Sequence, residues 1–368
     1  MTAKSAIRAE AERLFAAFRA AGAVAVEADL LLPAETLLDL YGEDIRARAY
    51  VTHDPMQGEM MLRPDFTVPV VQAHMAHGAD TARYAYMGEV FRKQNHLGEA
   101  RMREYLQVGF EVFDRTAPVA ADAEVFALFA TCLQGLDLRP VTGDVGILLA
   151  AVRGLTTSER RRAALLRHIW RPQRFRTLLD RFAGRAAVPQ ARAELLQRLG
   201  KDAPEALIDA AGSFTGLRGA DEIAARARAL IDDADTPDLP APEAALLYDL
   251  LTLVSPAEAA LTHLRRVTPM LPAIAPAVDR YAARLEALKS RGVDTATLAF
   301  EASHGRTLME YYDGFVFSFL GPANMPPVAT GGRYDALTAV LGQGRSIPAV
   351  GGIIRPHLVT ALRGARGC

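Results

Sequence analysis

The segment from residue 105 to residue 112 constrains the fold most, because polar and apolar side chains alternate along it. Alternate residues of a β-strand share a face, so one face of this strand is a polar floor made by Tyr105, Gln107, Gly109 and Glu111. The opposite, apolar face belongs against a hydrophobic core and is made by Leu106, Val108, Phe110 and Val112. We expect Gly109 to leave room for a ligand between Gln107 and Glu111.

Two nearby segments bring further polar side chains that suit a small ligand. Arg63, Asp65 and Thr67 share a face if their segment is extended, and Arg92 follows a strand-like run. A free amino acid needs oxygen acceptors for its ammonium group, a cation for its carboxylate and groups fitted to its side chain. Those types are supplied by Asp65, Thr67, Arg92, Gln107 and Glu111. Each alone is more often a surface or structural polar group, but together they predict an amino-acid site.

The rest of the chain alternates between helical and strand-like patterns. Apolar residues on one helical face predict an amphipathic helix that ends near Gly22, and a second helix is expected after Pro33. Residues 50–113, 297–301 and 314–319 are typical of strands, and a Gly-rich turn and a final helix follow the last of them.

Between residues 155 and 291 the sequence is rich in Ala, Leu and Arg at helical spacing, and prolines divide it into short helices. We therefore predict an α+β fold in which helices flank an antiparallel sheet. The sheet and its helices are expected from residues 1–154 and 292–368, and a helical insertion is expected from residues 155–291.

The charge of the chain gives no overall field that would attract nucleic acid, since the net charge is -1 and the pI is near 6.7. Residues 153–198 contain 12 arginines and three acidic residues, whereas residues 201–243 contain 10 acidic residues and four basic ones. A basic run can mark an RNA site. Here compensation between the two runs, or an ordinary solvated face, is the favoured interpretation.

Other kinds of site find little support in the sequence. The two cysteines lie far apart, which indicates neither a disulfide framework nor a metal cluster and fits a reducing cytoplasm. His74 and His77 lie three residues apart on an expected helix, but no third zinc ligand is apparent. Gly342-Gln-Gly344 is expected to be a turn rather than a dinucleotide motif. With no apolar run of roughly 18 residues and no targeting peptide, we expect a cytoplasmic protein without metal or cofactor.

Several motifs of the chain resemble those of histidyl-tRNA synthetases, which are class II aminoacyl-tRNA synthetases. Leu62-Arg-Pro-Asp-Phe-Thr67 is similar to the LRPEGT stretch of that family, and Glu310-Tyr-Tyr-Asp-Gly-Phe-Val-Phe317 resembles its histidine-binding DYYTGTVF stretch. Motif 2 is resembled by Gly88-Glu-Val-Phe-Arg92, Arg101-Met-Arg103 and Gln107-Val-Gly-Phe-Glu111. The approach to motif 3 is resembled by Gly331-Gly-Arg-Tyr-Asp335 and Pro348-Ala-Val-Gly351. The resemblance covers nearly the whole chain except the helical insertion and implies the class II synthetase fold.

The resemblance implies a histidine-binding pocket at matching positions. Its side chains would be Asp65, Thr67, Arg92, Gln107, Glu111, Tyr311 and Tyr312. Asp65, Thr67 and Gln107 would hold the amino group of histidine, and Glu111 and Tyr312 would lie near its imidazole. Arg92 would face the carboxylate or a phosphate. No catalytic or metal-binding residue is implied.

The chain departs from the synthetase motifs where ATP would be bound and histidine activated. Leu358 stands where motif 3 has an ATP-clamping arginine, Thr307 stands at another arginine position, and FRxE is replaced by Phe91-Arg-Lys-Gln94. Adenylate formation depends on fixed cations where negative charge develops, so these departures argue against activation. The chain also stops soon after motif 3, and we expect neither an anticodon-binding domain nor tRNA binding.

By resemblance, the chain is identified as a member of the ATP phosphoribosyltransferase regulatory subunit family. A short catalytic subunit of that complex condenses ATP with phosphoribosyl pyrophosphate, and the regulatory paralogue takes part in activation and in feedback inhibition by histidine. The resemblance implies a homodimer within a hetero-oligomer. Two alternatives stay open, because a fold alone does not fix a function: a truncated synthetase that forms histidyl-adenylate, and a ligase or transferase that uses another acceptor.

Overall fold

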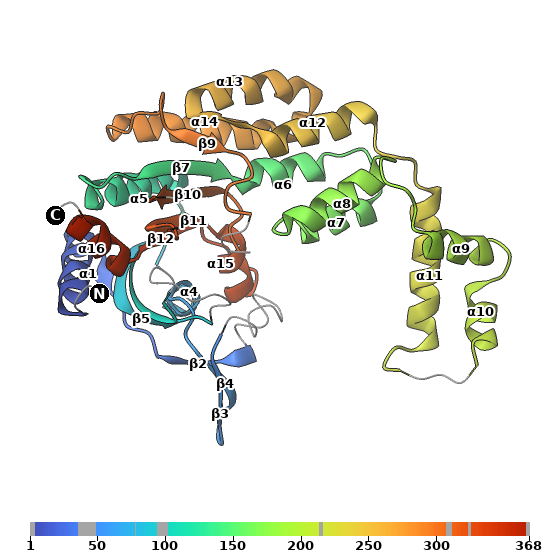
Figure 1. Cartoon of the computed structure of the whole chain (residues 1–368), viewed down its shortest axis with the longest axis horizontal. Coiled ribbons are helices and arrows are strands. Elements are labelled where there is room, and N and C mark those ends of the chain that lie inside the picture. The colour runs from blue at the N-terminus through green and yellow to red at the C-terminus, as the bar shows by residue number, and fades with distance from the viewer. Residues whose placement is uncertain are drawn as a thin grey trace. The chain divides into compact units, whose positions relative to one another are not determined.

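The computed structural model describes residues 4–35, 49–77, 79–93, 102–212, 216–306, 311–322 and 325–365. The chain divides into two compact units, which are described separately (Figure 1). The first unit comprises Met1–Ile147, Thr252–Arg266 and Ala275–Cys368, and the second comprises Leu148–Leu251 and Val267–Ile274. Gln94, Thr307 and all but the first two residues of the helix expected after Pro33 lie outside the described residues.

A mixed sheet is the centre of the first unit, and nine of its strands lie in the described residues. In sheet order they are β1 (Val24–Ala25), β5 (Thr81–Phe91), β6 (Glu104–Asp114), β12 (Ala349–Ile354), β11 (Ala329–Arg333), β10 (Phe315–Leu320), β7 (Arg139–Asp144), β9 (Ala299–Glu301) and β8 (Val254–Pro256). The predicted antiparallel pairing is correct for the centre, but β1 pairs with β5, and β7 with β9, in parallel. Long connections separate the strands of both parallel pairs, as parallel pairing requires.

Seven helices lie wholly or largely in the first unit (Figure 1). They are α1 (Lys4–Ala20), α4 (Thr67–His77), α5 (Pro118–Cys132), α13 (Ala257–Val267), α14 (Ala275–Ser290), α15 (Asp335–Leu341) and α16 (Pro356–Ala365). This number refers to the described part of the unit. Helix α1 packs on β5 and β6 and against α16, whereas α5 packs on β6, β11 and β12 and against α14.

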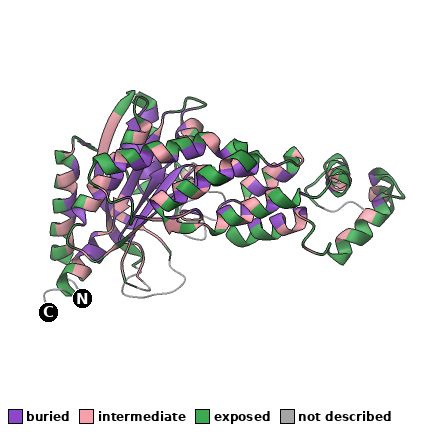
Figure 2. Ribbon diagram, turned by 90° about the horizontal axis from the view of Figure 1, so that it is seen from above, coloured by how far each residue is buried: buried purple, intermediate pink, exposed green. Residues whose placement is uncertain are grey.

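The core of the first unit confirms the two-faced strand predicted from the sequence. Val108, Phe110 and Val112 of β6 are fully buried, and most residues of the central strands are buried as well (Figure 2). The ring of Phe110 lies 5.4 Å from that of Phe18, a buried residue of α1. The amphipathic helix expected before Gly22 is therefore α1, and its apolar face covers β6.

The described part of residues 50–113 contains strands and one helix, as the strand-like runs and the helix expected around His74 and His77 predict. A small sheet contains β2 (Leu31–Pro33), β4 (Gly58–Leu62) and β3 (Val51–Asp54), in that order. Helix α4 then begins at Thr67. Its His74 is buried, stacks on Phe113 at 3.8 Å and lies 3.1 Å from the hydroxyl of Tyr84, so its contacts are those of a core histidine.

The Gly-rich segment expected to form a turn is strand β11, and β12 was also missed. Glycine weakens a strand locally, but here close packing requires it. A Cβ on Gly331 would lie 2.3 Å from the Phe317 ring and 2.4 Å from the carbonyl oxygen of Gly351. Neighbouring strands thus leave no space for a side chain at this position. The turn expected at residues 342–344 is present, with positive φ at Gln343 and Gly344.

The second unit is helical, as expected. Its helices are the end of α6 (Val145–Arg153), α7 (Glu159–Arg167), α8 (Pro172–Phe182), α9 (Gln190–Leu199), α10 (Pro204–Ala210), α11 (Ala220–Asp235), α12 (Ala241–Thr252) and the 3₁₀ turns η1 (Thr268–Met270) and η2 (Pro272–Ile274). Arg161 and Arg192 pair with Asp233 at 2.8 and 2.6 Å. These pairs join the basic run to the acidic run, in agreement with the compensation favoured above. Among the described helices, none is long and apolar enough to cross a membrane.

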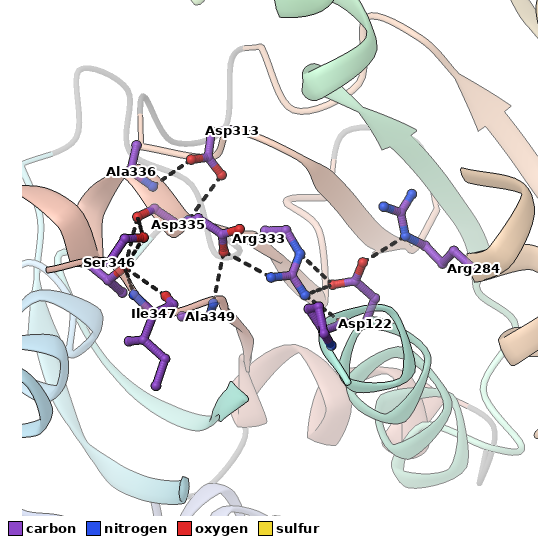
Figure 3. Close-up of polar contacts among 11 residues, drawn as sticks. Asp122, Arg284, Asp313, Arg333, Asp335, Ala336, Ser346, Ile347 and Ala349 are labelled. Carbon is purple, nitrogen blue, oxygen red and sulfur yellow. Dashed lines mark hydrogen bonds and ion pairs between the residues drawn. The ribbon is translucent and has the colours of Figure 1, made fainter. Parts of the chain in front are cut away.

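The boundaries of the second unit differ from the expected insertion 155–291, because α13 and α14 lie largely in the first unit. One reason is a buried ion cluster. Arg284 of α14 contacts Asp122 and Asp144, each at 2.8 Å, and Arg333 of β11 contacts Asp122 at 2.7 Å. Figure 3 shows Asp122 between the two arginines. Because these contacts cross from α14 to α5, β7 and β11, they fix α14 to the sheet.

Candidate ligand-binding site

One cavity of the first unit, with a volume of about 70 Å³, contains all seven side chains implied by the synthetase resemblance. They are Asp65, Thr67, Arg92, Gln107, Glu111, Tyr311 and Tyr312. The remaining lining residues are Pro327, Thr330, Tyr334, Gly351, Gly352, Ile353 and Arg355. The cavity thus lies over β6 and β12, between the start of α4, the segment before β10 and the strand β11.

Glu111 of β6 is the best-anchored carboxylate of the cavity. It accepts hydrogen bonds from the hydroxyls of Thr67, Tyr86 and Tyr334 at 3.0, 2.9 and 2.6 Å. Burial raises the pKa of Glu111 to about 7, against the opposing effect of these three donors and with a small addition from Asp65. Glu111 therefore fixes the hydroxyls of Thr67 and Tyr334, which line the cavity, and that of Tyr86 behind it, besides any contact with a ligand.

Gln107 lies two residues before Gly109 on the same face of β6. Its side-chain nitrogen donates to the hydroxyl of Tyr105 at 3.5 Å, a long contact. Its Oε1 atom is buried and has no hydrogen-bond partner in the described structure. A buried acceptor without a partner costs free energy, so this oxygen is suited to a donor from a ligand.

Asp65 and Arg92 bring opposite charges to the cavity. Asp65 is 4% exposed, and its Oδ2 lies 3.9 Å from a guanidinium nitrogen of Arg92. The Nε of Arg92 donates to the carbonyl oxygen of Pro64 at 2.8 Å. Arg92 is therefore held at the edge of the cavity beside a carboxylate.

Three tyrosines complete the wall and stay neutral near pH 7. Burial raises the pKa of Tyr311, Tyr312 and Tyr334, and nearby acidic groups raise it further. Tyr334 was not among the predicted site residues, although the motif at residues 331–335 that contains it was recognised. Its side chain could be assigned to the pocket only with the position of β11 known.

The role expected for Gly109 is wrong. A Cβ at Gly109 would lie 2.1 Å from the ring of Tyr86, so this glycine makes room for Tyr86 rather than for a ligand. Gly351 of β12 has a comparable role for Glu111, since a Cβ there would lie 1.5 Å from the Oε2 atom of Glu111. Both glycines therefore allow the Glu111 cluster to form.

Arg63 also differs from expectation, because its segment is not extended and Thr67 begins α4. The Nε of Arg63 donates to the carbonyl oxygen of Glu89 at 2.7 Å, and its guanidinium lies 4.0 Å above the ring of Phe66. Arg63 therefore packs against Phe66 and the backbone of β5, and it does not line the cavity.

The departures from the synthetase motifs have clear structural settings where they are described. Leu358 is 2% exposed on α16 and brings an apolar side chain to the position of the motif 3 arginine. Arg306 precedes Thr307, which stands at a second arginine position of the family. Arg306 is buried and its pKa is lowered to about 10 by burial, but it is not among the residues that line the cavity.

Comparisons with known proteins agree with this fold. The family model described as histidyl-tRNA synthetase matches residues 2–255 and 220–357. The crystal structure of an ATP phosphoribosyltransferase regulatory subunit/histidyl-tRNA synthetase from Bacillus halodurans C is 20% identical, with a TM-score of 0.68 over 97% of this chain and 79% of that one. The crystal structure of histidyl-tRNA synthetase from Nostoc sp. PCC 7120 has 16% sequence identity and a TM-score of 0.61, and the match covers 98% of this chain and 71% of that one. The protein has the class II fold of histidyl-tRNA synthetases.

Curated relatives narrow this class. The ATP phosphoribosyltransferase regulatory subunit of Allorhizobium ampelinum is 33% identical over 358 residues, which cover 91% of this chain and 92% of the relative. The regulatory subunit of Mesorhizobium japonicum is 31% identical over 376 residues and 98% of both chains. The chain belongs to the ATP phosphoribosyltransferase regulatory subunit family, as its motifs predicted.

Proposed function

We propose that this chain is a non-catalytic subunit that activates a short catalytic ATP phosphoribosyltransferase and transmits feedback inhibition by histidine, which binds in the cavity. The relatives named above support the regulatory role and a catalytic partner. The complex acts in the cytoplasm, at the first step of histidine biosynthesis, and contains the chain as a homodimer within a hetero-oligomer.

The observation that carries the histidine proposal is the buried Oε1 atom of Gln107. An ammonium group has three donors and no acceptor, and this oxygen can accept one of them. The carboxylate of Asp65 lines the same cavity and supplies a matching negative charge. The neutral tyrosines of the wall suit a small, partly aromatic ligand.

The non-catalytic proposal is supported by the residues around motif 3. Adenylate formation places negative charge on transferring phosphates, and fixed cations must stabilise it. Leu358 supplies no such charge and is buried. The main alternative remains a synthetase-like enzyme that forms histidyl-adenylate, and the test of catalysis below separates the two.

Calorimetric titration with L-histidine tests the pocket. Gln107→Leu removes the amide and should weaken binding about ten- to a hundredfold, the cost of a hydrogen bond to a charged group. Gln134→Leu makes the same chemical change at an exposed position outside the cavity and should leave the affinity unchanged. Equal affinity in all three proteins would place histidine elsewhere.

A further inference from the structure

Arg355 is a cation of the cavity that the sequence did not single out. It directly follows β12, one residue beyond the last pair of the β12–β6 ladder, Ile354 with Val108. In an antiparallel ladder the next position of β6 is Gln107. Arg355 is therefore level with Gln107, and it lines the cavity together with Gly351 and Ile353, which share its face of the strand.

The guanidinium of Arg355 is held in place by neutral groups. Its Nη1 donates to the carbonyl oxygen of Pro327 at 2.6 Å, and its backbone N–H donates to the carbonyl oxygen of Val328 at 2.9 Å. A further hydrogen bond joins it to Tyr105. Within the described residues, Arg355 forms no ion pair with a carboxylate, in contrast to Arg92, which lies beside Asp65.

The two arginines make this end of the cavity positive. Burial alone would raise the pKa of the Tyr105 hydroxyl, but Arg92 and Arg355 lower it below its ordinary value. Burial and the nearby Arg92 also lower the pKa of Arg355. A half-buried cation beside a second cation is stabilised by an anion, and an anion in the cavity, which Arg355 lines, can reach it.

We propose that Arg355 binds the α-carboxylate of the amino acid in the cavity and makes the site selective for ligands in which that carboxylate is free. This inference rests on the proposed histidine site. Glu111 and Gln107 lie four positions apart on the same face of β6, and Arg355, across the β6–β12 ladder, is level with Gln107. A histidine with its imidazole toward Glu111 and its ammonium on Gln107 directs its carboxylate to Arg355. Esters, amides and alcohols of the amino acid lack the negative charge and lose this contact.

Titration of the full chain with L-histidine and with histidinol tests this assignment, because histidinol has a neutral CH₂OH group in place of the carboxylate. The wild type should prefer histidine by about ten- to a hundredfold, the value of a charge-assisted hydrogen bond. Arg355→Gln should lose that preference, because its affinity for histidine should fall while its affinity for histidinol stays unchanged. Arg139→Gln, which changes an arginine of β7 outside the cavity, should keep it.

The outcomes separate this inference from the histidine site itself. The role of Arg355 would be overturned if the wild type bound both ligands with equal affinity, or if Arg355→Gln lost affinity for both ligands equally. Either result would leave the proposed histidine site of the wild type standing. Absence of histidine binding to the wild type would overturn the histidine site and the inference with it. If Arg355→Gln does not fold, Arg355→Lys keeps the charge without the planar fork and should retain only part of the preference.

Discussion

Glu111 is a carboxylate whose ionisation the fold opposes, and this has a consequence for stability. Its pKa is raised from 4.5 to about 7 by burial. Between those pH values the folded protein binds more protons than the unfolded chain, so the stability due to this group is complete below pH 4.5 and is lost as the pH rises through about 7. Asp313, whose pKa burial and Asp335 raise to about 7, acts in the same direction.

We predict that Glu111→Gln reduces the fall in stability between pH 4.5 and pH 7. The part removed should be on the order of 3 kcal/mol, because each unit of pKa difference corresponds to about 1.4 kcal/mol. Urea unfolding at several pH values measures it. Glu12→Gln, at an exposed position of α1, is the control and should retain the wild-type slope. Glu111→Gln should keep the part of the slope that is due to Asp313. An unchanged slope in Glu111→Gln would contradict the raised pKa.

Single residues of the pocket were predictable where a motif names them, and unpredictable where only a strand register places them. The seven predicted side chains line one cavity. They were predictable because each belongs to a recognisable motif. Arg355 belongs to no such motif, and it reaches the cavity only because β12 lies beside β6. Gly109 was correctly placed on the polar face but assigned the wrong neighbour, since nothing in the sequence indicates that the Tyr86 ring lies over it.

Among the elements, sequence patterns predicted the ones with strong periodicity and failed where glycine is required by neighbours. Helix α1 and strand β6 have regular apolar faces and were predicted correctly. Strand β11 contains two successive glycines, which locally favour a turn. Its pairing with β10 and β12 overrides that preference, and a single sequence contains no signal for such tertiary pairing.

Helix α14 should depend strongly on its buried arginine. Arg284→Met leaves Asp122 without one of its two cations and removes the cation that contacts Asp144. Loss of one partner of a buried ion pair costs about 3–5 kcal/mol. Chemical denaturation should show a loss of this size for Arg284→Met, whereas Arg280→Met, one turn earlier and exposed, should change stability little. Equal small losses in both variants would show that the ion cluster does not fix α14.

At the scale of the whole molecule, the sequence predicted the class of fold and a helical unit, but it placed the boundaries of that unit differently. Residues 155–291 are helical almost throughout, so composition alone gives no reason to divide them. One reason for the division is Arg284, which attaches α14 to α5 and β7 of the first unit. An ion pair between residues 162 positions apart is beyond the reach of local patterns.

The whole chain should not activate histidine. We predict no histidine-dependent exchange of pyrophosphate into ATP, because Leu358 is apolar and buried where a motif 3 arginine would stabilise the phosphates. Leu358→Arg alone should not restore exchange, since Thr307 and Gln94 remain. Robust exchange by the wild type would favour the synthetase-like alternative.

The rate of a short catalytic ATP phosphoribosyltransferase from the same source, measured alone and with this chain across a range of histidine concentrations, tests the regulatory role most directly. The chain should raise the rate, and histidine should inhibit the mixture more strongly than the catalytic subunit alone. A catalytic subunit that is fully active and fully histidine-sensitive without this chain would contradict the proposed function.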